Sequence, residues 1–477
     1  MARTFRAAQE RLAAGDLGAA EALFRDVHRA QPQAAEPLFH LGRIARAQGA
    51  LETARDLLEQ ASALRPKEPT ILQALAEVQA LCGDSAAALA SHDALIKLAP
   101  GHPKPLADKA LYLQQLGEFE AADTAFRKAL RRAPDSGELY RMWLGSKRLT
   151  KGDPLIRKMQ QLFTHPRMSE AGRIHLGFAL AKAMEETGAH DKVFGYLTIA
   201  NRLQRKAYPY DPAARDAEVA GIMRASDRLP PPAETDFAPI IVTGMARSGT
   251  TLFEQILGAH DAVTAGGELA IGLRLAYGLF GTPPQMAPLA GMTSETLTDF
   301  ATRYAAQARA RVAQPELRIT DKSIQNHLIL GHLHAAMPRA GLVVVKRDPR
   351  DIALSIYKNH FAGGTHRYSN DLADIARYIR SFERIVAFWK EHVPVQEVSY
   401  DDLIAAPEAQ AQALVEGLNL PWQPQCLEFY KQGGTVKTLS IAQVRRPVYK
   451  SSGGAWRRYE REMQPFIEAW DSSSGTE

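Results

Sequence analysis

The chain is poor in cysteine, with only Cys82 and Cys426, far apart in the sequence. Two such residues form neither a disulfide framework nor a cysteine-based metal motif. Long apolar runs are also missing, since no segment approaches the ~20 residues that cross a bilayer. The first residues lead into a polar amphipathic stretch without the apolar core of a signal peptide. We therefore expect a protein of the reducing cytoplasm that has no membrane span.

An excess of one charge sign is missing too. Lys and Arg number 58 and Asp and Glu 53, so the net charge of +5 is modest for 477 residues and does not indicate a nucleic-acid binder. The 45% hydrophobic and 23% charged composition excludes wholesale disorder and a collagen-like chain. The length is too great for one ordinary core and predicts two to four domains.

A repeat with a period of 34 residues fills the first third of the chain. Three residue types keep this register through four turns, namely Pro32, Pro66, Pro100 and Pro134, Gly15, Gly49, Gly83 and Gly117, and Ala20, Ala54, Ala88 and Ala122. Glycine allows a tight exit from a first helix, alanine lets a second helix cross closely, and proline ends the unit. Phe24, Leu58 and Phe126 supply an apolar residue on the second helix, with His92 as the exception.

This period resembles that of the tetratricopeptide repeat, a pair of antiparallel helices. The resemblance implies four repeats over residues 1–134, stacked into a curved α-solenoid because one unit cannot bury its apolar face alone. Such an array is either a spacer or a groove that binds a protein or peptide partner. Binding is the usual role of the architecture, so we favour the groove.

Residues 135–228 are expected to form a helical extension. Within it, residues 176–202 look like one further, degenerate repeat in which an insertion has shifted the phase. Pro230, Pro231 and Pro232 follow in a proline-rich linker over residues 229–238. Consecutive prolines favour a stiff connector, so we place a domain boundary there.

After the linker, an apolar β-branched run at 239–243 predicts a buried strand, followed by a glycine loop and a helix-compatible segment at 253–259. A strand, loop and helix N-terminus in this order form an anion site. Gly244, Gly249 and Thr251 have the spacing of a nucleoside triphosphate loop, but Thr250 stands where that loop has its lysine. Arg247 offers a different cation. The loop should hold a phosphate, although transfer from ATP is disfavoured.

A second apolar run at 341–345 predicts another strand, which delivers the charged segment 346–351 at its carboxyl end. Arg347 is followed eight positions later by Ser355 on a helical segment. Taken alone, these charges would fit a solvated helix start.

Together the two elements resemble the sulfotransferase family, which implies a P-loop-like α/β domain with a parallel sheet over residues 239–470. In that family the first loop grips the 5′-phosphosulfate of 3′-phosphoadenosine-5′-phosphosulfate, and an arginine and serine at this spacing grip the 3′-phosphate. The sequence 247–252 matches the tyrosylprotein sulfotransferases more closely than the small cytosolic enzymes. So does an acidic residue 21 positions after the arginine, here Glu268.

The resemblance implies roles for individual residues. Glu268 would be the general base, Arg247 and Lys322 would stabilise charge on the transferring group, and Ser440 would be a hydroxyl donor. The donor nucleotide would be bound by Arg247, Ser248, Gly249, Thr250, Thr251, Arg347, Ser355, Tyr400 and Arg446. No metal is required, because fixed cations and backbone dipoles can stabilise the developing charge. A helix cap for Glu268 and a salt bridge with Asp321 for Lys322 are the plainer alternatives, and His260 is a weaker candidate base.

The chain also departs from the luminal enzymes, which have no repeat array. Ala265 replaces a cysteine before the acidic motif, and Ala455 replaces a late lysine. The donor contact of that lysine is either absent or supplied by Lys450 or Arg457. The subtype resemblance implies peptidyl tyrosine as the acceptor, but these departures leave a saccharide or small-molecule hydroxyl open. A phosphotransferase using the same loop and a non-catalytic scaffold are the rival functions. Residues 431–461 hold eight basic residues against Glu460 alone, which favours attraction of a polyanionic donor.

Overall fold

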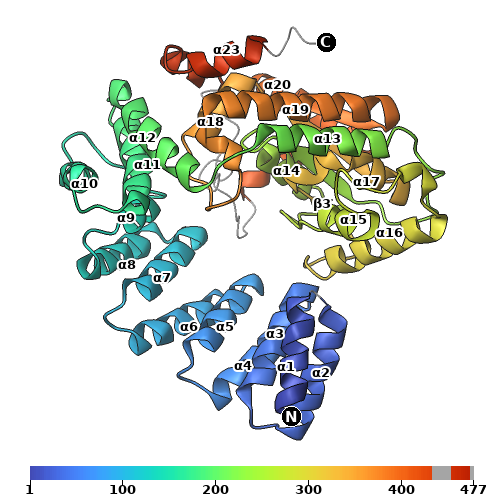
Figure 1. Cartoon of the computed structure of the whole chain (residues 1–477), viewed down its shortest axis with the longest axis horizontal. Helices are drawn as coiled ribbons and strands as arrows, with labels where there is room; N and C mark the ends of the chain where they lie inside the picture. Colours follow the sequence, from blue (N-terminus) through green and yellow to red (C-terminus); the bar gives the residue numbers. More distant parts are fainter. Residues whose placement is uncertain (15, 432–452, 473–477) are drawn as a thin grey trace. The chain divides into compact units, whose positions relative to one another are not determined.

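The computed structural model describes residues 1–14, 16–431 and 453–472 (Figure 1). The chain divides into two compact units, residues 1–134 and residues 135–477. The residues expected to form a helical extension thus belong to the same unit as the α/β region.

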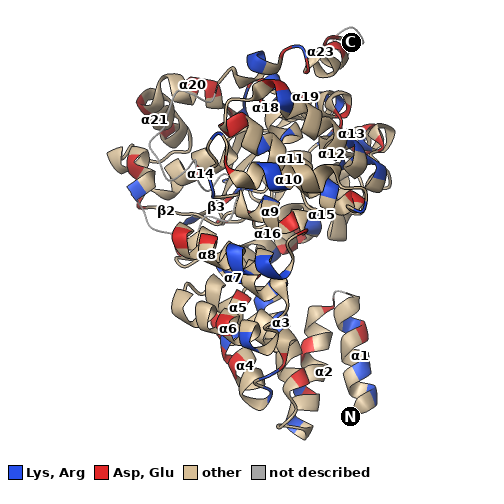
Figure 2. Ribbon diagram, turned by 90° about the vertical axis from the view of Figure 1, so that its left-hand side faces the viewer, with Lys and Arg blue, Asp and Glu red and all other residues tan. Residues whose placement is uncertain are grey.

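The first unit consists of helix pairs that follow one another along the chain (Figure 1). The pairs are α1 (Ala2–Ala13) with α2 (Leu17–Ala30), α3 (Ala35–Gln48) with α4 (Leu51–Leu64), α5 (Pro69–Leu81) with α6 (Ser85–Leu98), and α7 (Pro103–Leu116) with α8 (Phe119–Arg132). The predicted repeat architecture is confirmed. Its helices carry both signs of charge (Figure 2).

The repeated small residues explain this geometry. Ala20, Ala54, Ala88 and Ala122 are all fully buried, so a larger side chain would separate the paired helices. Gly49 ends α3 with φ 87°, a left-handed conformation that glycine adopts without a steric penalty. Its N–H donates to the carbonyl of Arg46, which satisfies one of the last carbonyls of the helix.

The second unit begins with helices, namely α9 (Gly137–Trp143), α10 (Pro154–Thr164), α11 (Glu170–Glu186), α12 (Val193–Ala207) and α13 (Pro212–Ala225). Helices α11 and α12 pack against each other across Gly188, where φ is 78°, in the segment for which the sequence predicts a degenerate repeat. Helix α13 packs against α19 (Leu372–His392) of the α/β region. The extension therefore contributes directly to the second core.

A parallel sheet with strand order β2-β3-β1-β4-β5 forms the centre of the second unit. The strands are β1 (Ile240–Gly244), β2 (Val263–Thr264), β3 (Arg318–Asp321), β4 (Gly341–Lys346) and β5 (Val395–Ser399). Strand β1 is buried along its whole length, and β4 is buried through its four central residues, as expected for the middle of a covered sheet. The predicted combination of α-solenoid and parallel α/β domain is confirmed.

The remaining elements connect and cover these strands. They are α14 (Thr250–Gly258), α15 (Gly272–Phe280), α16 (Ser294–Arg309), α17 (Leu330–Ala336), α18 (Pro349–Tyr357), α20 (Tyr400–Ala405), α21 (Pro407–Gly417) and α23 (Gln464–Ser472), with short 3-10 turns that include η3 (Ile324–Leu328), η4 (Arg367–Asn370), η5 (Pro424–Lys431) and η7 (Ala455–Tyr459). Cys426 is buried in the core beneath the sheet and Cys82 is partly exposed, and both are free thiols. No helix in the described part of the chain is long and apolar enough to cross a membrane.

Candidate active site

The residues predicted to form the site follow four neighbouring strands. The loop 245–249 follows β1, Lys322 follows β3, Arg347 follows β4 and Tyr400 follows β5. Because these strands are parallel and adjacent, their carboxyl ends share one edge of the sheet. The sheet therefore gathers residues as distant in the sequence as Arg247 and Tyr400, which are 153 positions apart.

The loop after β1 has the form of an anion cradle. Arg247 and Gly249 both adopt left-handed conformations, with φ 70° and φ 102°, and turn the chain into α14. The N-cap residue of that helix is Gly249, which has no side chain that could cap the first amide groups. The hydroxyl of Ser248 is buried and has no hydrogen-bond partner within the described residues. Amide groups of the first helical turn and this hydroxyl are thus suited to an anionic ligand.

The other predicted donor-binding residues join this loop through direct contacts. A Cβ atom at Gly249 would lie 2.4 Å from the ring of Tyr400, so the ring packs on the loop backbone. The Arg347 guanidinium carbon lies 4.5 Å from the centre of that ring, and one of its N–H groups donates to the Arg247 carbonyl at 3.3 Å. Arg247 Nε donates to Ser355 Oγ at 3.0 Å. The arginines that follow β1 and β4 therefore lie in contact beside the loop.

Lys322 and Glu268 form an ion pair beside this group. Lys322 Nζ lies 2.8 Å from Glu268 Oε1, and the lysine side chain is 2% exposed while the glutamate side chain is 58% exposed. A buried ammonium group needs a counter-charge, which Glu268 supplies. The sequence left Asp321 open as the partner of Lys322, and Glu268 takes that place instead.

Glu254 of α14 is a site residue that sequence reasoning missed. Its carboxylate is 3% exposed and accepts from Gly267 N at 2.8 Å and Thr320 Oγ1 at 2.9 Å. Burial raises its pKa, although nearby Lys322 opposes this effect. The carboxylate fixes the glycine turn that presents Glu268. A carboxylate between the apolar pairs Leu252–Phe253 and Ile256–Leu257, on the helix after a phosphate loop, was the available signal.

Asp321 braces the same region from the end of β3. It is fully buried and accepts from Tyr304 Oη at 2.5 Å, Asn326 Nδ2 at 3.1 Å and Leu269 N at 3.3 Å. Burial and the adjacent carboxylate raise the pKa of Tyr304, which keeps its hydroxyl a donor. The backbone on both sides of the Lys322–Glu268 pair is thereby held by buried hydrogen bonds.

A hollow of about 1000 Å³ opens beside Glu268. Its lining is rich in rings, with Tyr210, Tyr277, Tyr368, Tyr378 and His366. The rings of Tyr368 and Tyr378 stack with centroids 3.7 Å apart. Burial lowers the pKa of His366, while Glu268 opposes that shift. Glu268, the exposed member of the ion pair, therefore lines a hollow large enough for a ring-bearing substrate.

Comparison with known proteins finds a family match within each unit. Residues 239–424 match the family described as the Sulfotransferase family, and residues 11–78 and 104–136 match Tetratricopeptide repeat families. The chain carries a tetratricopeptide repeat array followed in the sequence by a sulfotransferase domain. The predicted resemblance is confirmed at this level.

Relatives of the sulfotransferase domain differ in how much they share. An uncharacterized protein of Aquifex aeolicus (strain VF5) is 32% identical over 386 residues, which cover 77% of this chain and 50% of the relative. The chain thus spans half the length of that protein. A putative protein-tyrosine sulfotransferase of Caenorhabditis briggsae is 24% identical, covering 46% of this chain and 80% of the relative. The solved sulfotransferase domain from the Synechococcus PCC 7002 olefin synthase is 17% identical with a TM-score of 0.36, covering 52% of this chain and 96% of that one.

One wall of the hollow comes from outside the residues that match the sulfotransferase family. Arg215 of α13 stacks over Tyr378 at 4.4 Å and donates to Ser381 Oγ at 3.1 Å and Glu218 at 2.7 Å. Tyr277 Oη of α15 donates to Glu218 at 3.0 Å. The helical extension is therefore built into the sulfotransferase domain at the side where Glu268 lies.

His260 of the sulfotransferase domain has structural contacts. His260 Nδ1 accepts from Ala262 N at 3.0 Å, and its Nε2 lies 2.9 Å from the Pro421 carbonyl and donates to it. Both ring nitrogens are thus engaged, which removes the weaker candidate base. Within the described ranges, no three His, Cys, Asp or Glu side chains group in a way that could hold a metal ion.

Two predicted residues of the sulfotransferase domain, Ser440 and Arg446, lie outside the described residues. The chain is described again from residue 453, where Asp351 of α18 accepts from Gly454 N at 2.6 Å and Trp456 N at 3.0 Å. Asp351 is 3% exposed. It therefore anchors the C-terminal segment in addition to lying in the first turn of its helix.

Proposed function

We propose that the sulfotransferase domain moves a sulfonate from 3′-phosphoadenosine-5′-phosphosulfate to an acceptor hydroxyl. The observation that carries this proposal is the contact of Lys322 with Glu268, which itself lines the ring-rich hollow. It places a carboxylate that can take a proton beside a cation that can stabilise negative charge. The anion cradle of Arg247 lies at the same edge of the sheet.

The described residues fit the proposed donor. The 5′-phosphosulfate would be held by Arg247, Ser248, Gly249, Thr250 and Thr251. A helix N-terminus with glycine as its cap residue suits an anion, as does a buried hydroxyl that has no partner among the described residues. Thr250 in place of the lysine of a triphosphate loop disfavours ATP. Arg347 and Ser355 would hold the 3′-phosphate. Tyr400 would support both groups by packing on Gly249 and Arg347, with Arg446 as a further proposed contact.

The proposed reaction is a direct displacement at sulfur. The acceptor oxygen forms a bond to sulfur while the bond from sulfur to the bridging phosphate oxygen breaks. Glu268 takes the acceptor proton, and adenosine 3′,5′-bisphosphate leaves with the electron pair. Arg247 and Lys322 would stabilise the developing charge, with Ser440 as a proposed donor. Lys322 would exchange its contact with Glu268 for one with the sulfonate, which leaves the carboxylate free to accept the proton.

For the acceptor we propose peptidyl tyrosine. The rings that line the hollow suit a phenol ring, because aromatic pairs gain from offset and edge-on contacts. The related proteins of Caenorhabditis briggsae and Danio rerio are named as protein-tyrosine sulfotransferases. A saccharide or a small-molecule hydroxyl is the competing acceptor.

We further propose that the tetratricopeptide array binds a protein or peptide partner and so brings acceptors to the domain. The free thiols Cys82 and Cys426 support placement in the reducing cytoplasm.

The test is incubation of the full chain with ³⁵S-labelled donor and three acceptors, namely a tyrosine peptide, an oligosaccharide and a simple phenol. Label in the tyrosine peptide supports the proposal in full. Label only in the oligosaccharide retains the sulfonate transfer and overturns the tyrosine acceptor. Transfer of phosphate from ATP without use of the sulfate donor would instead establish a phosphotransferase.

A further inference from the structure

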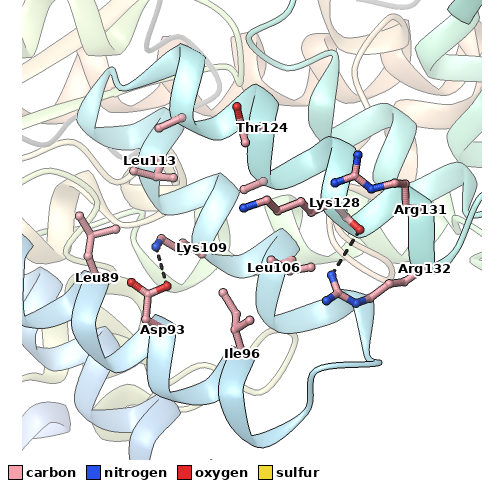
Figure 3. Close-up of a pocket in the computed structure, with 12 residues that line it drawn as sticks. Leu89, Asp93, Ile96, Leu106, Lys109, Leu113, Thr124, Lys128, Arg131 and Arg132 are labelled. Carbon is pink, nitrogen blue, oxygen red and sulfur yellow. Dashed lines mark hydrogen bonds and ion pairs between the residues drawn. The ribbon is translucent and has the colours of Figure 1, made fainter.

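The tetratricopeptide array has a hollow of its own, of about 700 Å³ (Figure 3). It is lined by α6 and α8, the second helices of the third and fourth pairs, together with α7 between them. The hollow lies wholly within the first unit, so its chemistry does not depend on the sulfotransferase domain.

The floor of this hollow is apolar. Leu106 and Leu113 of α7 are 5% and 6% exposed and belong to the core of the array. Leu89 and Ile96 of α6 are only partly buried and face the same space (Figure 3). Binding of an apolar group that displaces water from such partly covered aliphatic side chains is favourable, because it removes apolar surface from water.

Basic side chains of α7 and α8 lie beside this apolar floor. Lys109 is neutralised by Asp93, whose carboxylate lies 2.6 Å from the ammonium group. Lys128, Arg131 and Arg132 also line the hollow, and none of them forms an ion pair with the described residues. Arg132 instead donates to the Lys128 carbonyl at 3.4 Å. The hollow thus has three uncompensated cations.

The helix dipole explains only part of this arrangement. Arg131 and Arg132 lie in the last turn of α8, where cations are generally favourable. Lys128 lies one turn earlier and extends toward the apolar floor between Thr124 and Leu106 (Figure 3). Its ammonium group is therefore placed for a ligand that combines negative and apolar groups.

We infer that this hollow binds an acidic peptide segment of a partner protein, with an apolar side chain on the floor and carboxylates beside Lys128, Arg131 and Arg132. The inference rests on the proposal that the array binds a partner and is independent of sulfonate transfer. The twelve lining residues include no aromatic ring on which a nucleic-acid base could stack. An acidic peptide is therefore favoured over a single-stranded nucleic acid.

The experiment measures fluorescence anisotropy of a labelled peptide of Glu-Glu-Leu repeats with the full chain. Binding should weaken as salt rises from about 0.05 M to about 0.3 M, because exposed charges are screened. Lys128→Glu with Arg131→Glu should weaken binding by about tenfold or more, since attraction becomes repulsion. The control, Arg3→Glu with Lys67→Glu, changes the charge equally at exposed positions away from the hollow and should bind like the unaltered chain.

Three probes separate the alternatives. Peptides of Lys-Lys-Leu and of Glu-Glu-Ser repeats should bind much more weakly, because the first reverses the charge and the second lacks the apolar group. A single-stranded oligothymidine that bound as well as the acidic peptide would overturn the inference. So would equal binding by the Lys128→Glu, Arg131→Glu variant, or the absence of binding by the acidic peptide at low salt. Sulfonate transfer to a free tyrosine peptide, measured alongside, reports on the domain separately.

Discussion

Lys322 Nζ contacts Glu268 Oε1 at 2.8 Å, although the lysine is almost fully buried and the glutamate is more than half exposed. The two residues lie 54 positions apart. The contact joins the proposed base to a cation that the proposed reaction needs elsewhere. In this contact one oxygen of the Glu268 carboxylate is engaged by the ammonium group and is not available to an acceptor hydroxyl. Release of Glu268 on donor binding would therefore couple the activation of the base to the presence of the donor.

Glu268→Gln is expected to lower turnover by ~10²–10⁴-fold, because the amide cannot take the acceptor proton. Binding of the donor should persist, since the anion cradle is unchanged. Single-turnover rates and calorimetric titration of adenosine 3′,5′-bisphosphate check the two parts. The exposed Glu234→Gln is the matched control and should leave both unchanged. Ordinary turnover by Glu268→Gln would remove this residue from the mechanism.

Glu254 is expected to act as a positioning residue through Gly267 and Thr320. Glu254→Leu leaves two buried donors without an acceptor, at about 1–3 kcal/mol each, and should lower kcat as the glycine turn loosens. Glu254→Gln keeps an oxygen at the same place, so it should restore most of kcat and of stability. Kinetics and urea unfolding of both variants provide the check. Equal loss of kcat in the two variants would show that the charge, rather than the hydrogen bonds, matters.

Arg347→Ala is expected to weaken adenosine 3′,5′-bisphosphate binding by about tenfold or more, since a hydrogen bond to a charged group contributes about 1.5–3 kcal/mol. Adenosine 5′-phosphate, which lacks the 3′-phosphate, should lose much less affinity in the same variant. Arg339→Ala, at an exposed arginine, is the control. A similar loss for both nucleotides would indicate damage to the loop through Tyr400 rather than a lost 3′-phosphate contact.

The sequence carried enough information for the repeats and for the two central strands, because each depends on local pattern. Buried runs at 239–243 and 341–345 correspond to β1 and β4. Strand β5 is only half-buried along its length and β2 has two residues, so neither has a local hydrophobic signature. The parallel sheet brings Arg247, Arg347 and Tyr400 into contact, and their role in binding the donor stays a prediction.

Other parts of the site depend on contacts between distant segments. The buried carboxylate of Glu254 has a positioning role only because the fold brings the Gly267 N–H and the Thr320 hydroxyl to it. Arg215 of α13 stacks on Tyr378 of α19, and neither helix by itself predicts that the two pack together. For the same reason the wall of the hollow that the helical extension contributes, with Tyr210 and Arg215, was not predicted. Side-chain partners in such places follow from packing, and the periodicity of a single segment does not specify them.

The stability of the second unit is expected to fall with acidification because of His332 on α17. The ring is fully buried, and neither nitrogen has a hydrogen-bond partner within the described residues. Burial lowers its pKa from 6.5 to about 4. Between these values the unfolded chain binds more protons than the folded one. The stabilisation is therefore complete above pH 6.5 and decreases as the pH falls toward 4.

His332→Leu should remove this dependence, which amounts to about 1.4 kcal/mol per pH unit for one proton. Urea unfolding at several pH values between 6.5 and about 4 would measure how steeply the free energy of unfolding depends on pH. His165→Leu, which alters an exposed histidine of the same unit, should keep the original slope. His327 is also buried, and its pKa of about 3 leaves a remaining slope in the His332→Leu variant. An unaltered slope in that variant would mean that His332 gains a proton inside the folded protein, which requires an opening of the packing around α17 at mildly acidic pH.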